Sequence, residues 1–195
     1  LEGFFLKSFQ ERGKKWENIR FYPYLMIEIK LSQNIINKCR SRAKDIGKLK
    51  NSITRGKGNL AGIIGEYIVH KHLKNSKWEN TYDYDLIHKN KKIDVKSKRC
   101  NSPPLDFYEC SIAETSLHQE CDEYVFVRIL NDFTKAWILG RMTQKKYFKT
   151  ARKMIEGQVD PSNNFTVKTN CYNIPIKELN DLPVAQKPIS FKGLG

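Results

Sequence analysis

The sequence predicts an α/β protein that folds as a single domain over residues 1–195. Three observations support this prediction. With 195 residues, of which 39% are hydrophobic, the chain is long enough to bury a core. Segments with apolar residues at helical spacing alternate with short runs in which apolar residues recur at every second position. A strongly apolar run, "YVFVRIL" from Tyr124 to Leu130, is typical of a β-strand.

The N-terminal region, about residues 1–50, is expected to extend the domain with one strand and one helix. Phe21 to Lys30, "FYPYLMIEIK", reads as an extended segment, and Ser32 is placed to cap the helix that follows. The helix carries an apolar face, Ile36, Cys39, Ala43 and Ile46, and an opposite basic face, Lys38, Arg40, Arg42 and Lys48.

A second helix is predicted in "LAGIIGEYIVHKHL", after a basic, turn-rich loop from Asn51 to Asn59. Asn59 is placed to cap this helix. Gly62 and Gly65 each cost the helix about 1 kcal/mol relative to alanine. We therefore expect a neighbouring segment to approach closely at these glycines.

The region after the second helix is predicted to be rich in strands. Strands are expected at Tyr82–His88, Lys92–Lys98 and Phe107–Ile112, a short helix at about Ala113–Glu120, and a hairpin from Tyr124–Leu130 and Lys135–Leu139 across an Asn131-Asp132 turn. Thr143 is placed to cap a basic helix that carries Lys145, Lys146, Lys149, Arg152 and Lys153. The core therefore spans about residues 59–130, and residues 135–195 form C-terminal additions.

The charge of the chain indicates a polyanionic partner. Thirty-five Lys and Arg residues against 21 Asp and Glu residues leave a net charge of +14, which favours nucleic acid over an acidic membrane surface. No apolar run has the length of a membrane span, and the N-terminus lacks the apolar region of a signal peptide. We therefore expect a cytoplasmic protein without a membrane partner, and the sequence leaves its oligomeric state open, a homodimer being one alternative.

The cysteines are expected to be reduced thiols. The chain has five cysteines and no C-x-x-C pair, which is not typical of a disulfide framework. A zinc site from Cys100, Cys110, Cys121 and His118 is an alternative, but it lacks the usual close pairs of ligands.

The segment "IDVK" contains an acid and a lysine that share one face of a predicted strand. Side chains alternate along a strand, so Asp94 and Lys96 point one way while Ile93 and Val95 point the other. Such acid-x-Lys triplets arise by chance about once or twice in a chain of this length. A second copy, Glu28-Ile29-Lys30, is present and serves as an internal control.

Two further acids distinguish Asp94 from the control copy. A two-residue turn within "HKNK" would place Asp85 opposite Asp94 or Lys96, whereas a three-residue loop would place it on the wrong face. Glu66 lies near the apolar side of the second helix, where a carboxylate needs a partner. No comparable acids precede Glu28, so we interpret that copy as structural.

This order of Glu66, Asp85 in "YDYDLI" and Asp94-x-Lys96 in "IDVKSK" resembles the PD-(D/E)xK nuclease superfamily. The lead-in "NSITRGKGNLAGIIGE" is similar to that of phage-encoded nucleases, which implies a bacterial or phage-infected host cell. The resemblance implies a restriction-endonuclease-like α-β-β-β-α-β core with a mixed central sheet. Two departures are Tyr84 in place of the proline before Asp85, and Asp94 in place of the commoner glutamate.

The resemblance also implies a function: a Mg²⁺-dependent hydrolase of phosphodiester bonds in DNA, more often an endonuclease, with Mn²⁺ as a substitute. Asp85, Asp94, the Val95 carbonyl and Glu66 would hold the metal, and Lys96 would orient the attacking water. Residues expected to contact nucleic acid are Arg55, Lys57, Lys98, Lys145 and Lys146.

Three alternatives remain open from the sequence. The acids and Lys96 could form a surface network of salt bridges. The chain could be a catalytically inactive nucleic-acid-binding module of the same fold, or a basic protein-interaction domain. Gln119, His70 and His72 are interpreted as ordinary surface residues.

Overall fold

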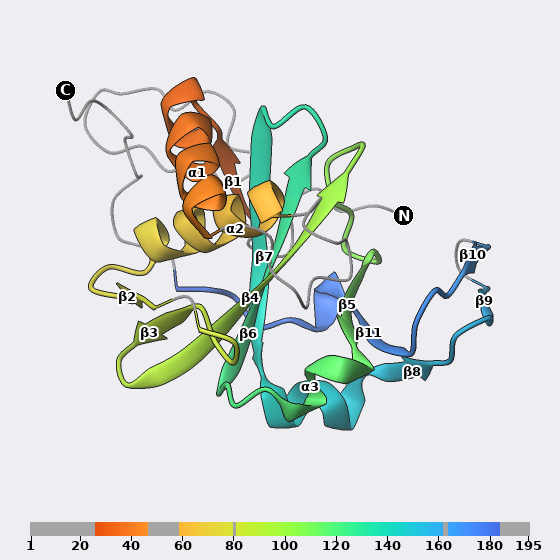
Figure 1. The fold of residues 1–195 in the computed structure, drawn as a ribbon. Helices are drawn as coiled ribbons and strands as arrows, with labels where there is room; N and C mark the ends of the chain where they lie inside the picture. The colour runs from red at the N-terminus through yellow and green to blue at the C-terminus, as the bar shows by residue number, and fades with distance from the viewer. Residues whose placement is uncertain (1–25, 47–58, 80, 162–163, 184–195) are drawn as a thin grey trace, which may run out of the picture.

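The protein is a mixed α/β structure built around one large sheet (Figure 1). This computed structural model describes residues 26–46, 59–79, 81–161 and 164–183. The helices are α1 (Gln33–Ile46), α2 (Asn59–His72) and α3 (Gln144–Thr150), with 3-10 turns η1 (Glu114–His118) and η2 (Ile176–Glu178). The strands are β1 (Ile27–Lys30), β2 (Lys77–Trp78), β3 (Leu86–His88), β4 (Lys91–Cys100), β5 (Glu109–Ala113), β6 (Glu123–Leu130), β7 (Lys135–Thr143), β8 (Arg152–Met154), β9 (Val159–Asp160), β10 (Phe165–Thr166) and β11 (Cys171–Pro175).

The large sheet has six strands in the order β1-β7-β6-β4-β3-β2. Strands β4 and β6 are parallel, and the other neighbouring pairs are antiparallel. The sheet is therefore mixed, as expected. The predicted hairpin of β6 and β7 is confirmed, although β7 continues as far as Thr143.

Both faces of the large sheet are covered. Alternate residues of β6 point to opposite faces, so Val125 and Val127 pack with α1 and α2, while Tyr124 and Phe126 pack with the β5-β11-β8 sheet and α3. Figure 1 shows α1 and α2 on one side of the large sheet and β5 and β11 on the other. Burial on both faces explains why β6 is an almost continuous apolar run.

Several predicted helix features are confirmed. The Ser32 hydroxyl accepts a hydrogen bond from the Ile35 N–H at 3.4 Å, and the Thr143 hydroxyl accepts one from the Lys146 N–H at 3.3 Å. Ile36 and Cys39 are buried on the apolar face of α1. Helix α2 begins at Asn59, but the side chains of Asn59 and Ile46 lie outside the described residues.

Two elements of the predicted core differ from the expectation, although their order along the chain is as expected. Strand β5 lies in the separate β5-β11-β8 sheet, because the chain leaves the large sheet after β4 at "NSPP" and β5 then pairs with β11. The helix expected at about 113–120 is only the 3-10 turn η1, which has no side-chain cap at Ala113.

Two predicted elements were too long. Residues 81–85 form a turn in which the Thr81 hydroxyl donates to the Tyr84 carbonyl at 2.7 Å, so β3 starts only at Leu86. Helix α3 ends at Thr150, and the chain continues into β8, which pairs with β11. Arg152 and Lys153 therefore belong to a strand rather than to the basic helix, and they form ion pairs with Glu109 and Glu114.

Candidate active site

The hairpin of β3 and β4 has the two-residue turn that the sequence required. His88 pairs with Lys91, and Lys89 and Asn90 between them both have positive φ, of 50° and 60°. This is the type I′ geometry that matches the twist of a hairpin. The regular pairing ends at Leu86–Ile93, so Asp85 lies one residue beyond the last pair of the hairpin.

Asp85 is bound to β4 through its side chain. Its Oδ2 accepts a hydrogen bond from the Val95 N–H at 2.8 Å, and its own N–H donates to the Ile93 carbonyl at 2.9 Å. The carboxylate thus takes the place of a backbone acceptor where the regular pairing of β3 and β4 ends.

Asp94 and Lys96 form an ion pair within the same strand. Lys96 Nζ lies 2.7 Å from Asp94 Oδ2, and Asp94 is 5% exposed. The ammonium also donates to Gln119 Oε1 at 2.9 Å and lies 5.7 Å from the centre of the Tyr124 ring. Lys96 is therefore held between an acid and an amide, which restricts its long side chain to one place.

Glu66 reaches the same region from α2. It is 7% exposed, and its Oε2 accepts a hydrogen bond from the Trp78 indole N–H at 2.8 Å. The Arg42 guanidinium of α1 lies 3.8 Å from the centre of the Trp78 ring. The prediction that Glu66 lies on the core side of its helix is confirmed.

The electrostatics connect the three acids, which we call the acid cluster: Glu66, Asp85 and Asp94. Burial raises the pKa of Glu66, the Trp78 hydrogen bond and the Arg42 charge oppose this, and Asp94 adds to the increase. Burial also raises the pKa of Asp85 well above its ordinary range, followed by repulsion from the other two acids; the Val95 N–H and Lys96 oppose it. Like charges thus meet in a site where water only partly screens them.

Close packing at Gly65 brings α2 against β4. A Cβ atom at Gly65 would lie 1.9 Å from the Ser97 hydroxyl oxygen, which is shorter than any permitted contact. The expectation of a close approach is therefore confirmed at Gly65. It is wrong at Gly62, where the nearest atom to a Cβ would be Glu66 Oε1 at 4.0 Å.

The sequence interpretation missed three residues of the site: Gln119, Arg42 and Trp78. Gln119 is not an ordinary surface residue, because it accepts from Lys96 and donates to the Tyr82 carbonyl at 2.9 Å. Arg42 is not on the exposed face of α1 but stacks on Trp78. No periodicity could identify these contacts, since each joins segments whose spacing is set by tertiary packing.

The donor chemistry of the acid cluster is compatible with a hard divalent cation. Each contact described above uses one oxygen of its carboxylate, and Mg²⁺ usually takes one or two carboxylates together with waters and substrate phosphates. In the described part of the chain, no group of three or more His, Cys, Asp or Glu side chains is placed so that it could hold a metal ion. The acid cluster therefore has the type of oxygen donor that Mg²⁺ prefers, but its side chains as they lie do not form a metal site.

The remaining predicted site residues are less connected to the acid cluster. Val95 is buried and donates its N–H to Asp85. Lys98 is exposed on β4, and Lys145 and Lys146 are exposed on α3. Arg55 and Lys57 lie outside the described residues.

The cysteines and histidines do not form the alternative zinc site within the described residues. All five cysteines are free thiols, as predicted. The interpretation of His72 as a surface residue was wrong: it is 4% exposed, and its Nε2 lies 2.9 Å from the Pro183 carbonyl oxygen. His70 is half-buried, with its Nδ1 2.9 Å from the Ser76 hydroxyl oxygen.

The described residues include no helix with the length and apolar character needed to cross a membrane. Comparison with known proteins adds no family to this description. No protein-family model matches the chain, and no curated protein matches it.

Proposed function

We propose that the protein is a Mg²⁺-dependent nuclease that hydrolyses phosphodiester bonds of DNA. The observation that carries the proposal is the meeting of Glu66, Asp85 and Asp94 beside the Lys96 ammonium, from a helix, a turn and a strand. The net charge of +14 supports a polyanionic substrate. DNA rather than RNA follows from the resemblance to the PD-(D/E)xK superfamily.

The acid cluster provides the reason for a metal ion. Gathering three carboxylates costs free energy unless positive charges offset their repulsion, and Lys96 and Arg42 supply two such charges against three acids. Asp85, Asp94, the Val95 carbonyl and Glu66 would hold the metal. A bound Mg²⁺ would polarise the phosphodiester and lower the pKa of a bound water.

Lys96 would act on the attacking water and on the charge that develops at the phosphate. Its ammonium is held by Asp94 and Gln119, so little reorganisation is needed when a phosphate arrives. The three N–H donors of an ammonium exceed these two contacts, which leaves one for the water or a phosphate oxygen.

The arrangement of elements gives partial support for a restriction-endonuclease-like core. Apart from the two-residue strand β2 between α2 and β3, the run α2, β3, β4, β5, η1 and β6 follows the expected α-β-β-β-α-β order, and the site lies on the β3–β4 hairpin beside α2. The separate sheet of β5 and the shortness of η1 are departures from that order.

The second candidate is an inactive nucleic-acid-binding module of the same fold. It is favoured by the absence of a complete metal cage among the described residues and by the engagement of Lys96 with Asp94. Both candidates predict salt-dependent binding of nucleic acid, but only the nuclease predicts cleavage.

A plasmid assay with a matched pair of variants tests the proposal. Wild-type protein, Lys96→Met and Lys30→Met would be incubated with supercoiled plasmid and linear duplex in Mg²⁺, Mn²⁺ or EDTA. We expect metal-dependent cutting by wild type and Lys30→Met and none by Lys96→Met. Lys30→Met is the matched control, because it makes the same substitution in the Glu28-Ile29-Lys30 triplet. Salt-sensitive binding without cutting by any protein would support the binding module instead.

A further inference from the structure

A small pocket opens beside the candidate active site, on the same face of the large sheet as Lys96. It has a volume of about 40 Å³ and lies between β4, β6 and β5. Its lining includes Lys96, Lys98, Ser111, Arg128 and Glu109. Of the ten residues that line the pocket, three are positively charged and one, Glu109, is an acid.

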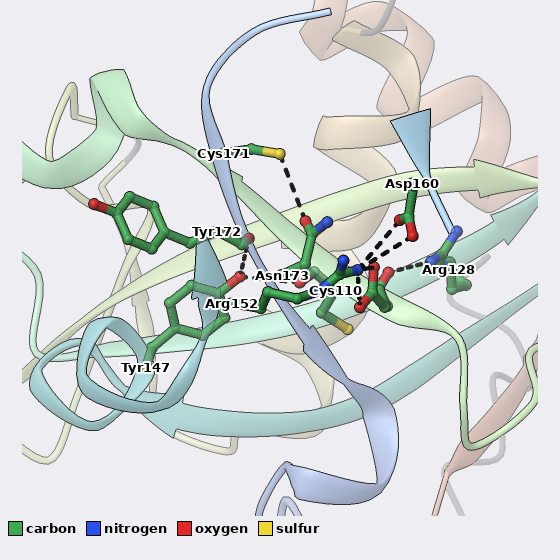
Figure 2. Close-up of polar contacts among 9 residues, drawn as sticks. Cys110, Arg128, Tyr147, Arg152, Asp160, Cys171, Tyr172 and Asn173 are labelled. Atoms are coloured by element: carbon green, nitrogen blue, oxygen red, sulfur yellow. Dashed lines mark hydrogen bonds and ion pairs between the residues drawn. The ribbon is translucent and has the colours of Figure 1, made fainter. Parts of the chain in front are cut away.

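Arg128 contributes an unusual charge to this pocket. It is 7% exposed, and its guanidinium donates one hydrogen bond, to the backbone carbonyl of Glu109 at 2.6 Å (Figure 2). A guanidinium has five N–H donors, and no ion pair joins this one to a carboxylate within the described part of the chain. A buried cation with only a neutral partner is costly, and an anion in the pocket would offset that cost.

Lys98 adds a second cation next to Arg128. The two residues are Cα partners in the parallel pairing of β4 and β6, so they are neighbours on one face. Lys98 is exposed as a residue, but its ammonium is partly shielded from water by the protein. This partial loss of water, and then repulsion from Arg128, lower the pKa of Lys98. An anion between the two would relieve this repulsion.

The nearby acids are already engaged by another arginine. Arg152 binds both carboxylate oxygens of Glu109, at 2.9 and 3.2 Å, and lies 3.3 Å from Asp160 Oδ1 (Figure 2). The one acid that lines the pocket is therefore shared with Arg152, and the pocket retains a positive character.

We propose that Lys98 and Arg128 form a phosphate-binding subsite that takes a backbone phosphate next to the scissile bond. The location supports this assignment, because Lys98 follows Lys96 by two residues on the same face of β4, a separation of about 7 Å along a strand. That distance is comparable to the spacing of successive phosphates in a nucleic-acid chain. The subsite rests on the proposed function.

Salt-titrated binding tests the subsite without cleavage. Anisotropy of a fluorescein-labelled DNA duplex would be measured in EDTA over a range of salt concentrations, for wild type, Lys98→Gln and Arg99→Gln. Arg99 is the matched control because it is the next residue of β4, is exposed and points to the other face. We expect Lys98→Gln to reduce the salt slope by about 0.9, the value for one phosphate contact, and Arg99→Gln to leave it unchanged.

Equal slope changes in Lys98→Gln and Arg99→Gln, or none in either, would overturn the subsite. Arg128→Gln should weaken binding further, and Arg128→Lys should restore part of it. Thermal melts would show whether the Arg128 variants fold; if they do not, the exposed Lys98 decides the question alone.

A measurement with inorganic phosphate distinguishes a wrong assignment of the subsite from a wrong assignment of nuclease activity. At matched ionic strength, phosphate in place of chloride should raise the Tm of wild type and Arg99→Gln but not of Lys98→Gln. If wild type binds no DNA and this pattern appears, the pocket holds free phosphate and the nuclease proposal falls. If DNA is cut but neither slope nor Tm depends on Lys98, the nuclease stands and the subsite falls.

Discussion

The chain contains the same short pattern, an acid, an apolar residue and a lysine, in two different places. In β4 the Asp94 side chain is 8% exposed and pairs with Lys96 two residues later. In β1 the Glu28 side chain is 39% exposed and pairs with Lys135 of the neighbouring strand at 2.8 Å, while its Oε2 accepts from the Trp137 indole at 3.2 Å. The pattern alone therefore does not decide how the charges pair.

The position of each strand in the sheet explains the difference. Among the described strands, β1 is at the edge of the sheet and pairs with β7 alone, and Glu28 and Lys30 are exposed. Strand β4 lies between β3 and β6, so its acid is buried, and it meets two further acids, one of them from α2. An interior strand with a neighbouring helix can collect charges that an edge strand leaves in solvent.

The largest expected effect is a loss of cleavage when the acid of the β4 triplet is neutralised. The same change in the β1 triplet is the control. Asp94→Asn should reduce metal-dependent cleavage by about 100-fold or more, because it removes a proposed metal ligand and the partner of Lys96. Glu28→Gln, which keeps an acceptor for Trp137, should cleave like wild type. Initial rates on a supercoiled plasmid give the comparison, and DNA affinity in EDTA should be retained in both variants. Equal rates for the two variants would remove the distinction between the triplets.

A second prediction concerns α2, the helix that packs closely against β4 at Gly65. Gly65→Ala should destabilise the protein by about 1–3 kcal/mol, because its Cβ would overlap the Ser97 hydroxyl. Gly62→Ala should be neutral or stabilising by up to about 1 kcal/mol, since its Cβ meets nothing closer than 4.0 Å. Urea unfolding monitored by circular dichroism measures both. A Gly65→Ala variant as stable as wild type would show that α2 and β4 do not pack this closely.

A third prediction addresses the amide that holds Lys96. Gln119→Ala should lower the cleavage rate about tenfold, because Lys96 loses one of its two positioning contacts. The decrease should appear in kcat rather than in KM, since Gln119 acts through Lys96. Gln33→Ala, on the exposed part of α1, is a suitable control. A change in KM alone would indicate that Gln119 contacts the substrate directly.

The smallest expected effect is a pH dependence of stability. The pKa of Asp85 is raised from its ordinary value of 3.8 by burial and by Glu66 and Asp94, so the folded protein binds the proton more tightly than the unfolded chain does. Stability should therefore fall as the pH rises above the ordinary value, and Asp85→Asn should flatten this fall. Asp85 is only half-buried, so water screens part of the effect.

Urea midpoints measured between about pH 4 and pH 8 provide the test. Asp106→Asn, outside the acid cluster, serves as the control and should follow the wild-type curve. A pH dependence that is the same in Asp85→Asn and wild type would mean that Asp85 does not contribute it.

Local chemistry made part of this structure predictable from sequence. Ser32 and Thr143 cap helices because a hydroxyl satisfies free N–H groups whatever else surrounds it. The turn at Lys89 and Asn90 follows from the short loop between the two strands and from the tolerance of asparagine for positive φ. This turn fixed the register of the hairpin up to Leu86–Ile93, next to which the Asp85 carboxylate accepts from the Val95 N–H.

The sequence by itself thus determined the mixed α/β class, the helix caps, the hairpin register and the nature of the acids near Lys96. Only the tertiary structure decided that β5 joins β11 in a separate sheet, that Arg42 stacks on Trp78, and that Gln119 holds Lys96. The physical reason is the range of the interactions. Caps and tight turns depend on neighbours within a few residues, whereas these contacts join segments whose distance is set by packing around the whole sheet.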